Sequence, residues 1–280
     1  MKSHNVRSGL ASQTRRLAVV AACAALALAA AQPSPLERAR LAYNQQRYDE
    51  AIAAAREGER IAETASQAQL LVARALLERF RAAGDPADIT AARGALAGID
   101  SAKLTPRDRG EMQVGLAETL FFADRFGAAA ELFDDALARA DQPGFGPRER
   151  LLGWYATALD RQAHREEPAA RRRIYRRLLD RMTVENRKGA GSAVASYWVV
   201  AATLGIDNVE AAWDAAVATW VRAPVTAGDG VALRADLDRL VLGFIIPRRA
   251  RLSPAGGRMP QTADAQIADW DAVKQIWPGR

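Results

Sequence analysis

The chain has 280 residues, of which 49% are hydrophobic, 6% aromatic and 26% charged, and its formal net charge is +6. It holds one cysteine and two histidines, with neither a C-x-x-C nor an H-E-x-x-H motif, so no zinc site is expected. The positive charge would favour nucleic acid as a partner only if it belonged to the folded part of the chain.

Residues 1–31 have the three parts of a secretory signal. Residues 1–16 carry four basic side chains and no acid, and 17–31 form an unbroken apolar run that ends in three alanines. A basic start, an apolar middle of about 7–15 residues and a small-residue end define such a signal. A membrane-spanning helix needs roughly 20 apolar residues. We therefore expect cleavage after Ala31, export to the periplasm or the medium, and no transmembrane span afterwards.

Two alternatives remain open for this segment. Residues 20–23 (Val-Ala-Ala-Cys) resemble a lipobox, in which Cys23 would become the lipid anchor of a bacterial lipoprotein, and residues 14–17 (Thr-Arg-Arg-Leu) resemble a twin-arginine signal. Cleavage after residue 31 removes Lys2, Arg7, Arg15, Arg16, His4 and Cys23 but no acid, so the net charge falls from +6 to +2 and no thiol remains. Nucleic acid is therefore not expected as a partner.

The rest of the sequence predicts an all-α protein. Alanine, leucine and arginine are good helix formers, apolar residues recur at spacings of three and four, and no long stretch alternates as a strand would. Several prolines stand where a helix can begin, because the first turn does not need their N–H. The expected helices are 35–46, 48–63, 66–83, 86–98, 106–124, 126–140, 147–163, 168–183, 192–204, 207–222, 229–246 and 264–276.

A short pattern occurs twice in the first half of the chain, 78 residues apart. In each copy an aromatic residue fixes a turn between two helices, and small residues three or more positions later let the helices approach. The matched residues are Tyr48, Ala51, Ala55 and Gly58 in the first copy, and Phe126, Ala129, Phe133 and Ala136 in the second. This pattern resembles the tetratricopeptide repeat (TPR), a helix–turn–helix unit that stacks into a superhelix.

The TPR resemblance covers about residues 35–145, although Gly84-Asp85-Pro86 stands where the middle hairpin should carry the motif. It implies antiparallel helical hairpins stacked as a TPR-like right-handed superhelix, an α-solenoid. We expect such hairpins over 35–188, closing hairpins over 189–246, a linker over 247–263 and a terminal helix over 264–277. In TPR proteins the first helix of each hairpin lines a peptide groove. The candidate groove residues are then Arg40, Tyr43, Asn44, Glu118 and Phe122.

Two apolar stripes at helical spacing are expected to face each other and close the end of the stack. Trp270 and Trp277, in the last predicted helix, are expected to pack back onto the body. The stripes consist of Val209, Trp213, Ala216, Val217 and Trp220 in one helix, and of Leu233, Leu237, Leu240, Val241 and Phe244 in the other.

The predicted helix 168–183 is unusually basic. Its apolar residues fall on one face, which leaves four arginines on more exposed faces. Two interpretations fit this pattern: an anion-binding surface for envelope polymer or lipid, or an ordinary solvated face in an arginine-rich chain. The four residues are Arg172, Arg173, Arg176 and Arg177.

No catalytic motif stands out. His164 is the one histidine after residue 31, and adjacent acids such as Asp134 and Asp135 point about 100° apart on a helix. We therefore expect no enzyme, metal or cofactor. The leading hypothesis is an exported scaffold module of the bacterial envelope that binds a peptide or protein on a concave helical surface. The alternatives are an adaptor that docks to anionic envelope polymer or lipid through helix 168–183, and an enzyme whose carboxylates come from distant positions.

Mass spectrometry of the mature amino terminus tests the signal prediction. We expect an unmodified chain that begins at Gln32, because cleavage follows the small-residue end of the apolar run. A chain that begins at a lipid-modified Cys23 would instead establish the lipoprotein alternative.

Overall fold

The structure is a computed structural model that describes residues 33–188, 191–252 and 262–278, and every regular element in these ranges is helical. The all-α prediction is therefore confirmed, while the predicted signal segment 1–31 lies outside the described residues. The helices are α2 (Pro35–Asn44), α3 (Tyr48–Gly58), α4 (Ala65–Ala83), α5 (Pro86–Ala97), α6 (Pro106–Phe122), α7 (Phe126–Ala138), α8 (Arg148–Ala163), α9 (Pro168–Asn186), α10 (Ala193–Gly205), α11 (Val209–Arg222), α12 (Gly230–Leu240), α13 (Ile246–Arg249) and α14 (Ala263–Ile276).

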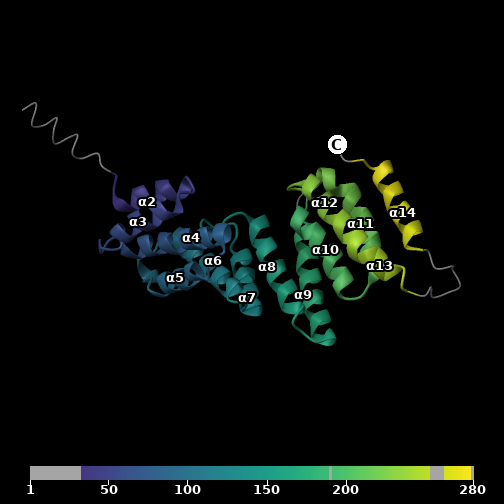
Figure 1. Cartoon of the computed structure of the whole chain (residues 1–280), viewed down its shortest axis with the longest axis horizontal. Helices are drawn as coiled ribbons and strands as arrows, with labels where there is room; N and C mark the ends of the chain where they lie inside the picture. The colour runs from purple at the N-terminus through teal and green to yellow at the C-terminus, as the bar shows by residue number, and fades with distance from the viewer. Residues whose placement is uncertain (1–32, 189–190, 253–261, 279–280) are drawn as a thin grey trace, which may run out of the picture.

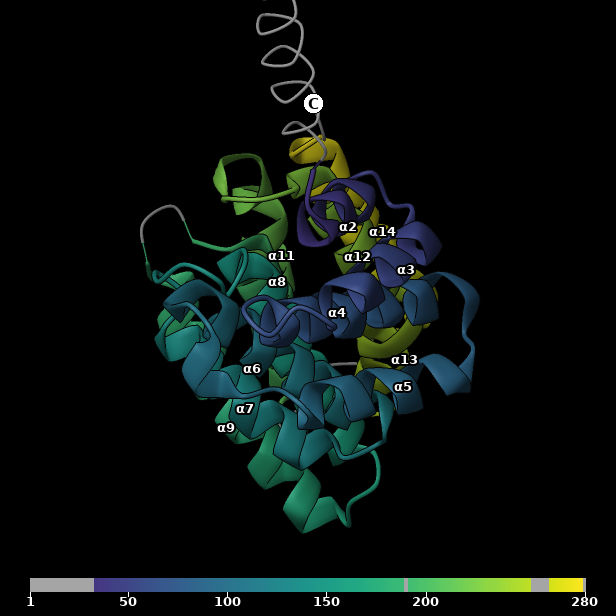
Figure 2. The same cartoon turned by 90° about the vertical axis from the view of Figure 1, so that its left-hand side faces the viewer.

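The helices follow one another along an elongated molecule. α2 and α3 lie at one end and α14 at the other, with α4–α8 nearer the first end and α9–α13 nearer the second (Figure 1). Viewed along the long axis, α2, α3 and α4 stand in front of the later helices (Figure 2). Each helix from α2 to α11 packs against the next one in the chain, α4 also contacts α2 and α6, and α10 also contacts α8 and α12.

Local sequence signals set where the helices begin. Pro35, Pro86, Pro106 and Pro168 each occupy the first turn of a helix, as predicted. Ser34 precedes α2 and accepts the N–H of Glu37, whose carboxylate in turn accepts the Ser34 N–H. This reciprocal pair satisfies two backbone donors that the first turn of a helix leaves free.

The same turn recurs between three pairs of helices. Gln46, Asp124 and Asp207 have φ angles of 60°, 60° and 66°. In each turn the next residue donates its backbone N–H to a carbonyl five residues back, which is the hydrogen bond of a Schellman-type helix end. These bonds run from Arg47 to Ala42 at 2.9 Å, from Arg125 to Leu120 at 2.9 Å and from Asn208 to Thr203 at 3.2 Å. The first two turns belong to the predicted repeat, and the third has no counterpart in the sequence pattern.

The apolar core is divided into clusters that follow the chain. One cluster joins α2 to α5, a second joins α6 to α10, and a third joins α10 to α14. Alanine is prominent in these clusters: Ala39, Ala51 and Ala55 in the first cluster and Ala117 and Ala129 in the second are 0% exposed. The small residues of the predicted repeat are therefore buried between helices, as expected.

The helix predicted at 229–246 differs from the observed one. α12 and α13 form one continuous helix that contains a π-helical turn, Val241–Ile245, and extends to Arg249. A π turn holds one more residue than an α turn, so the buried face shifts by one position. Ile245 is 0% exposed, whereas Phe244 is 57% exposed. The assignment of Phe244 to the apolar stripe was therefore wrong, although Leu233, Leu237, Leu240 and Val241 are buried as predicted.

The last helix packs back onto the body through Trp270. This side chain is 0% exposed and lies edge-on to Trp213 and Trp220, with ring centroids 5.9 and 5.3 Å away. Its indole N–H donates to Asp238 at 2.8 Å. Trp277 is half exposed, but its backbone carbonyl accepts the indole N–H of Trp220 at 3.0 Å. α14 thus covers the end of the third core cluster.

A pair of glycine substitutions tests the close contact between α9 and α10. A Cβ atom at Gly205 would lie 2.4 Å from the Tyr175 ring, whereas a Cβ atom at Gly153 would meet nothing within 4 Å. We expect Gly205→Ala to lower the free energy of unfolding by about 1–3 kcal/mol through overpacking. Gly153→Ala, in the middle of α8, should raise it by about 0.5–1 kcal/mol. Urea denaturation measures the free energy of unfolding of both variants. The same change in the two variants would contradict a close contact between Gly205 and Tyr175.

Candidate functional site

Two adjoining cavities form one groove along the first half of the molecule. Their volumes are 490 and 500 Å³, and both are lined by Tyr43, Arg74, Arg107 and Glu111. α2, α4 and α6 contribute to both cavities, and Arg150 of α8 lines the first. We call this feature the α2–α8 groove. It is built from alternate helices of the chain, so the packing of those helices fixes its walls.

Ion pairs join neighbouring helices along the α2–α8 groove. Arg74 of α4 pairs with Glu111 of α6, and Glu111 also accepts a contact from Arg107 at 3.2 Å. Arg81 of α4 contacts Glu118 of α6 at 3.1 Å. Because the partners of the α4–α6 pairs lie on different helices and are partly shielded from water, these pairs fix helix spacing more effectively than fully exposed pairs would.

The groove holds two carboxylates that share one arginine but differ in proton affinity. Glu118 is only 3% exposed, and burial raises its pKa against the opposing effect of Arg81 and Arg150. Burial would also raise the pKa of Glu78, but hydrogen bonding and charge from Arg81 bring it below its ordinary value. Arg81 lies 2.6 Å from Glu78 and 3.1 Å from Glu118, so its guanidinium group bridges the two carboxylates.

Tyr43 occupies the shared wall of the two cavities. The guanidinium carbon of Arg74 lies 4.6 Å from the centre of its ring, which is a cation–π distance. The Tyr43 hydroxyl donates to Glu78 at 3.4 Å, and burial raises its pKa, so the hydroxyl stays protonated. The ring is half-buried and therefore offers an apolar surface between charged groups.

The loop between α7 and α8 closes one end of the groove. Gly144 has a φ angle of 103°, and a Cβ atom there would lie 2.0 Å from the backbone oxygen of Arg107. Only glycine fits this approach. The neighbouring Phe145 is 5% exposed and packs against Gly110 of α6, which holds the loop in place.

Four of the five candidate groove residues line these cavities. Arg40, Tyr43 and Asn44 line the second cavity, and Tyr43 and Glu118 line the first. Phe122 does not: its ring packs against Phe80 at 4.7 Å within the core. The last turn of α6 therefore serves packing rather than the groove surface.

The sequence prediction missed the contribution of α4. This helix supplies Arg74, Glu78 and Arg81 to the groove. It was overlooked because its hairpin lacks the aromatic and alanine pattern that marked its neighbours. The order of the hairpins could have predicted this contribution, because α4 is the first helix of the hairpin between those that begin with α2 and α6.

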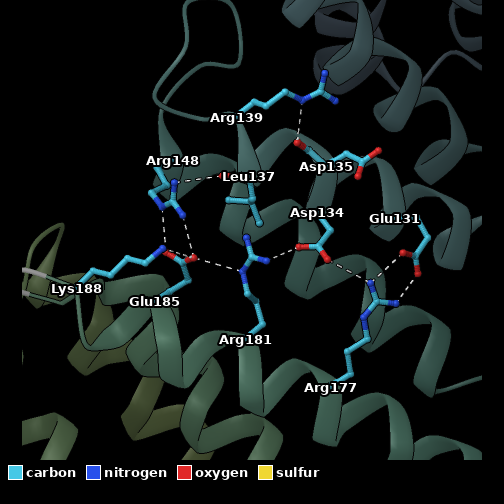
Figure 3. Close-up of polar contacts among 10 residues, drawn as sticks. All are labelled: Glu131, Asp134, Asp135, Leu137, Arg139, Arg148, Arg177, Arg181, Glu185 and Lys188. Carbon is cyan, nitrogen blue, oxygen red and sulfur yellow. Dashed lines mark hydrogen bonds and ion pairs between the residues drawn. The ribbon is translucent and has the colours of Figure 1, made fainter.

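The basic helix α9 forms an ionic ladder with α7 and α8, shown in Figure 3. Arg177 pairs with Glu131 and lies 3.5 Å from Asp134, while Arg181 lies 2.6 Å from Asp134. Arg177 was predicted to belong to an anion-binding surface. Its guanidinium group is instead matched by two carboxylates of α7.

Glu185 is the buried end of this ladder. Arg148 of α8 donates to both of its oxygens at 2.9 Å, and Lys188 adds a contact at 2.9 Å (Figure 3). Burial alone would raise the pKa of Glu185, but the hydrogen bonds from Arg148 and Lys188 hold it at about 2. This bidentate pair fixes the start of α8 to the end of α9.

The other three predicted anion-binding arginines fall into two groups. Arg172 lies 3.4 Å from Asp207, in the turn between α10 and α11. Arg173 and Arg176 are exposed and form no ion pair within the described parts of the chain. Of the four candidate anion-binding arginines, only Arg173 and Arg176 are therefore without a carboxylate partner in the described parts of the chain.

Comparison with known proteins supplies no family for this chain. No family model matches the sequence, and neither a curated protein nor a solved structure is similar to it. Within the described ranges, no helix combines the length and apolarity of a bilayer span. In the same ranges, acidic, histidine and cysteine side chains do not gather in groups of three that could hold a metal ion.

The Glu185 pair makes a prediction about acid stability. Its pKa of about 2 in the folded protein lies below the ordinary value of 4.5, so its contribution is fully present above pH 4.5 and is lost as the pH falls toward 2. We expect this loss to be about 2–3 kcal/mol in the free energy of unfolding. Glu185→Gln should remove that part of the pH dependence, as measured by urea denaturation between pH 5 and pH 2.

Glu131→Gln is the matched control, because Glu131 belongs to the same ladder but its side chain is 63% exposed. Solvent screening makes its contribution smaller. Parallel stability curves for wild type and Glu185→Gln from pH 5 to pH 2 would contradict the assignment.

Proposed function

We propose that this protein is an exported, TPR-like module of the bacterial envelope that binds a peptide or protein segment in the α2–α8 groove without catalysing a reaction. The groove itself carries the proposal. It runs along α2, α4, α6 and α8, which are the first helices of successive hairpins. In the family that the repeat resembles, this position is the one that receives a peptide.

The shape and chemistry of the groove suit an extended segment. Its two cavities share one wall, so a chain laid along it contacts both. Guanidinium and carboxylate groups held on helices can bond to peptide carbonyl and N–H groups, and the Tyr43 ring can pack against an apolar side chain. Because ion pairs between helices already order these groups, binding costs little further side-chain entropy.

The recurring turn supports the repeat part of the proposal. Gln46, Asp124 and Asp207 adopt one conformation with the same hydrogen bond, although the third turn lies outside the predicted TPR-like region. The turn joins every second hairpin, α2–α3, α6–α7 and α10–α11, and gives these three a common geometry, as the repeating unit of a stacked superhelix would have. The envelope location rests on the predicted signal at residues 1–31.

A second candidate function rests on the unequal carboxylates of the groove. Glu118 has a raised pKa and Glu78 a lowered one, and carboxylate pairs with divergent pKa values are typical of acid–base enzymes. The guanidinium group of Arg81, however, occupies the space between them. We therefore favour binding over catalysis at this site.

The adaptor alternative has less support than the groove. Of the four arginines proposed to contact an anionic envelope surface, Arg177 and Arg172 have carboxylate partners within the protein. The charges of Arg173 and Arg176 provide a weak electrostatic attraction, which physiological salt screens further.

Site-specific photocrosslinking in the native host tests the groove. A benzophenone amino acid at position 107 stands in the groove, because the Arg107 side chain is 71% exposed and lines both cavities. The same amino acid at the exposed position 93, on α5, is the control. We expect a crosslinked partner from position 107 alone, and Tyr43→Ala should lower its yield about tenfold by removing the apolar contact.

Equal crosslinking from positions 93 and 107 would contradict the groove as the binding site. Turnover of a glycan or ester by the purified protein, lost in Glu118→Gln, would establish the enzyme alternative instead.

A further inference from the structure

A cavity of 390 Å³ lies apart from the α2–α8 groove and has no lining residue in common with it. Its walls come from the end of α8, the start of α9, α10, the π-helical turn and α13. We call it the Tyr175 cavity. Its volume falls within the range of small-molecule sites, roughly 300–1,000 Å³.

Aromatic rings form one wall of the Tyr175 cavity. Tyr197 and Trp198 of α10 lie edge-to-face with ring centroids 5.4 Å apart, and both are partly exposed. The π-helical turn adds Phe244, which an unbroken α-helix would have turned into the core. Three partly exposed rings around one cavity offer a surface on which a flat apolar group can pack.

Guanidinium groups also line the cavity. Arg171 donates to the backbone oxygen of Glu166 at 3.2 Å, and Arg248 donates to the backbone oxygen of Leu204 at 3.3 Å. Neither arginine forms an ion pair within the ranges that the structure describes. Each therefore keeps an unneutralised positive charge and further N–H donors beside the cavity.

The acidic residues of the cavity already have partners. Asp160 accepts the Tyr175 hydroxyl at 2.7 Å and lies 3.6 Å from His164, while Asp207 pairs with Arg172. Neither carboxylate forms an ion pair with Arg171 or Arg248, and the three arginines that line the cavity outnumber its two aspartates. An anion that enters the cavity gains two guanidinium partners and displaces no existing ion pair.

We propose that the Tyr175 cavity binds a small organic anion that carries an aromatic ring. The ring packs against Tyr197, Trp198 and Phe244, and the anionic group bonds to Arg171 and Arg248. Charge-assisted bonds to guanidinium are stronger than neutral ones, so the site distinguishes an acid from a neutral molecule of the same shape.

Calorimetric titration of the purified protein with indole-3-acetate and with its neutral isostere, indole-3-acetamide, tests this proposal. We expect the acid to bind at least about tenfold more tightly than the amide, because only the acid forms charge-assisted bonds. The double substitution Arg171→Ala/Arg248→Ala should abolish the difference. Arg173→Ala, on the exposed face of the same helix, is the matched control and should preserve it.

Phe244→Ala separates the two halves of the site. It should weaken the acid and the amide by the same factor, since both share the ring. Equal binding of acid and amide by the wild-type protein, or an equal loss in Arg173→Ala and in the double variant, would overturn the proposal. Failure of the acid to bind at millimolar concentration would overturn it as well, with circular dichroism showing that the protein is folded.

Discussion

The close approach of neighbouring helices is the constraint on which the rest of this structure depends. Alanines such as Ala39, Ala51 and Ala129 are completely buried where helices meet, and any longer side chain would separate those helices. Alanine buries little apolar area, so stability has to come from many contacts of this kind. Charged groups collect along the edges of the helix pairs, where carboxylates such as Glu118 and Glu185 are buried as members of ion pairs.

Those charged edges account for both the ladder on α9 and the α2–α8 groove. In the ladder, carboxylates of α7 and α9 match the arginines, and Glu185 completes the row from a buried position. In the groove, matched pairs surround an open volume and the half-exposed ring of Tyr43. An arginine-rich helix is therefore not by itself an anion-binding surface, because internal carboxylates can use its charge first.

The sequence predicted the helices well and the side-chain environments unevenly. Proline and capping residues act within a single turn, so the starts at Pro35, Pro86 and Pro168 could be read directly. Arg177 could not be placed in the same way, because its partners lie more than forty residues earlier, on α7. Local patterns describe a helix, whereas an ion pair depends on which helices become neighbours.

Phe244 illustrates a different limit. Its spacing from Leu237 and Leu240 fits an α-helical stripe, and only the extra residue of the π turn moves it outward. Helical periodicity assumes a constant number of residues per turn, so a single wide turn is invisible to it. The case of α4 is different. Its residues carry no recognisable repeat pattern, and only its position in the order of hairpins indicates that it lines the groove.

The division of the core into clusters along the chain has a consequence for how the protein folds. Most contacts join helices that are adjacent in sequence, so each hairpin can form with little loss of loop entropy and as soon as its residues are available. The last helix is held in a different way. The bonds of Trp270 to Asp238 and of Trp277 to Trp220 span 32 and 57 residues, and the Trp270 ring lies against Trp213 and Trp220 of α11. The burial of Trp270 therefore depends on α11 and α12 being in place.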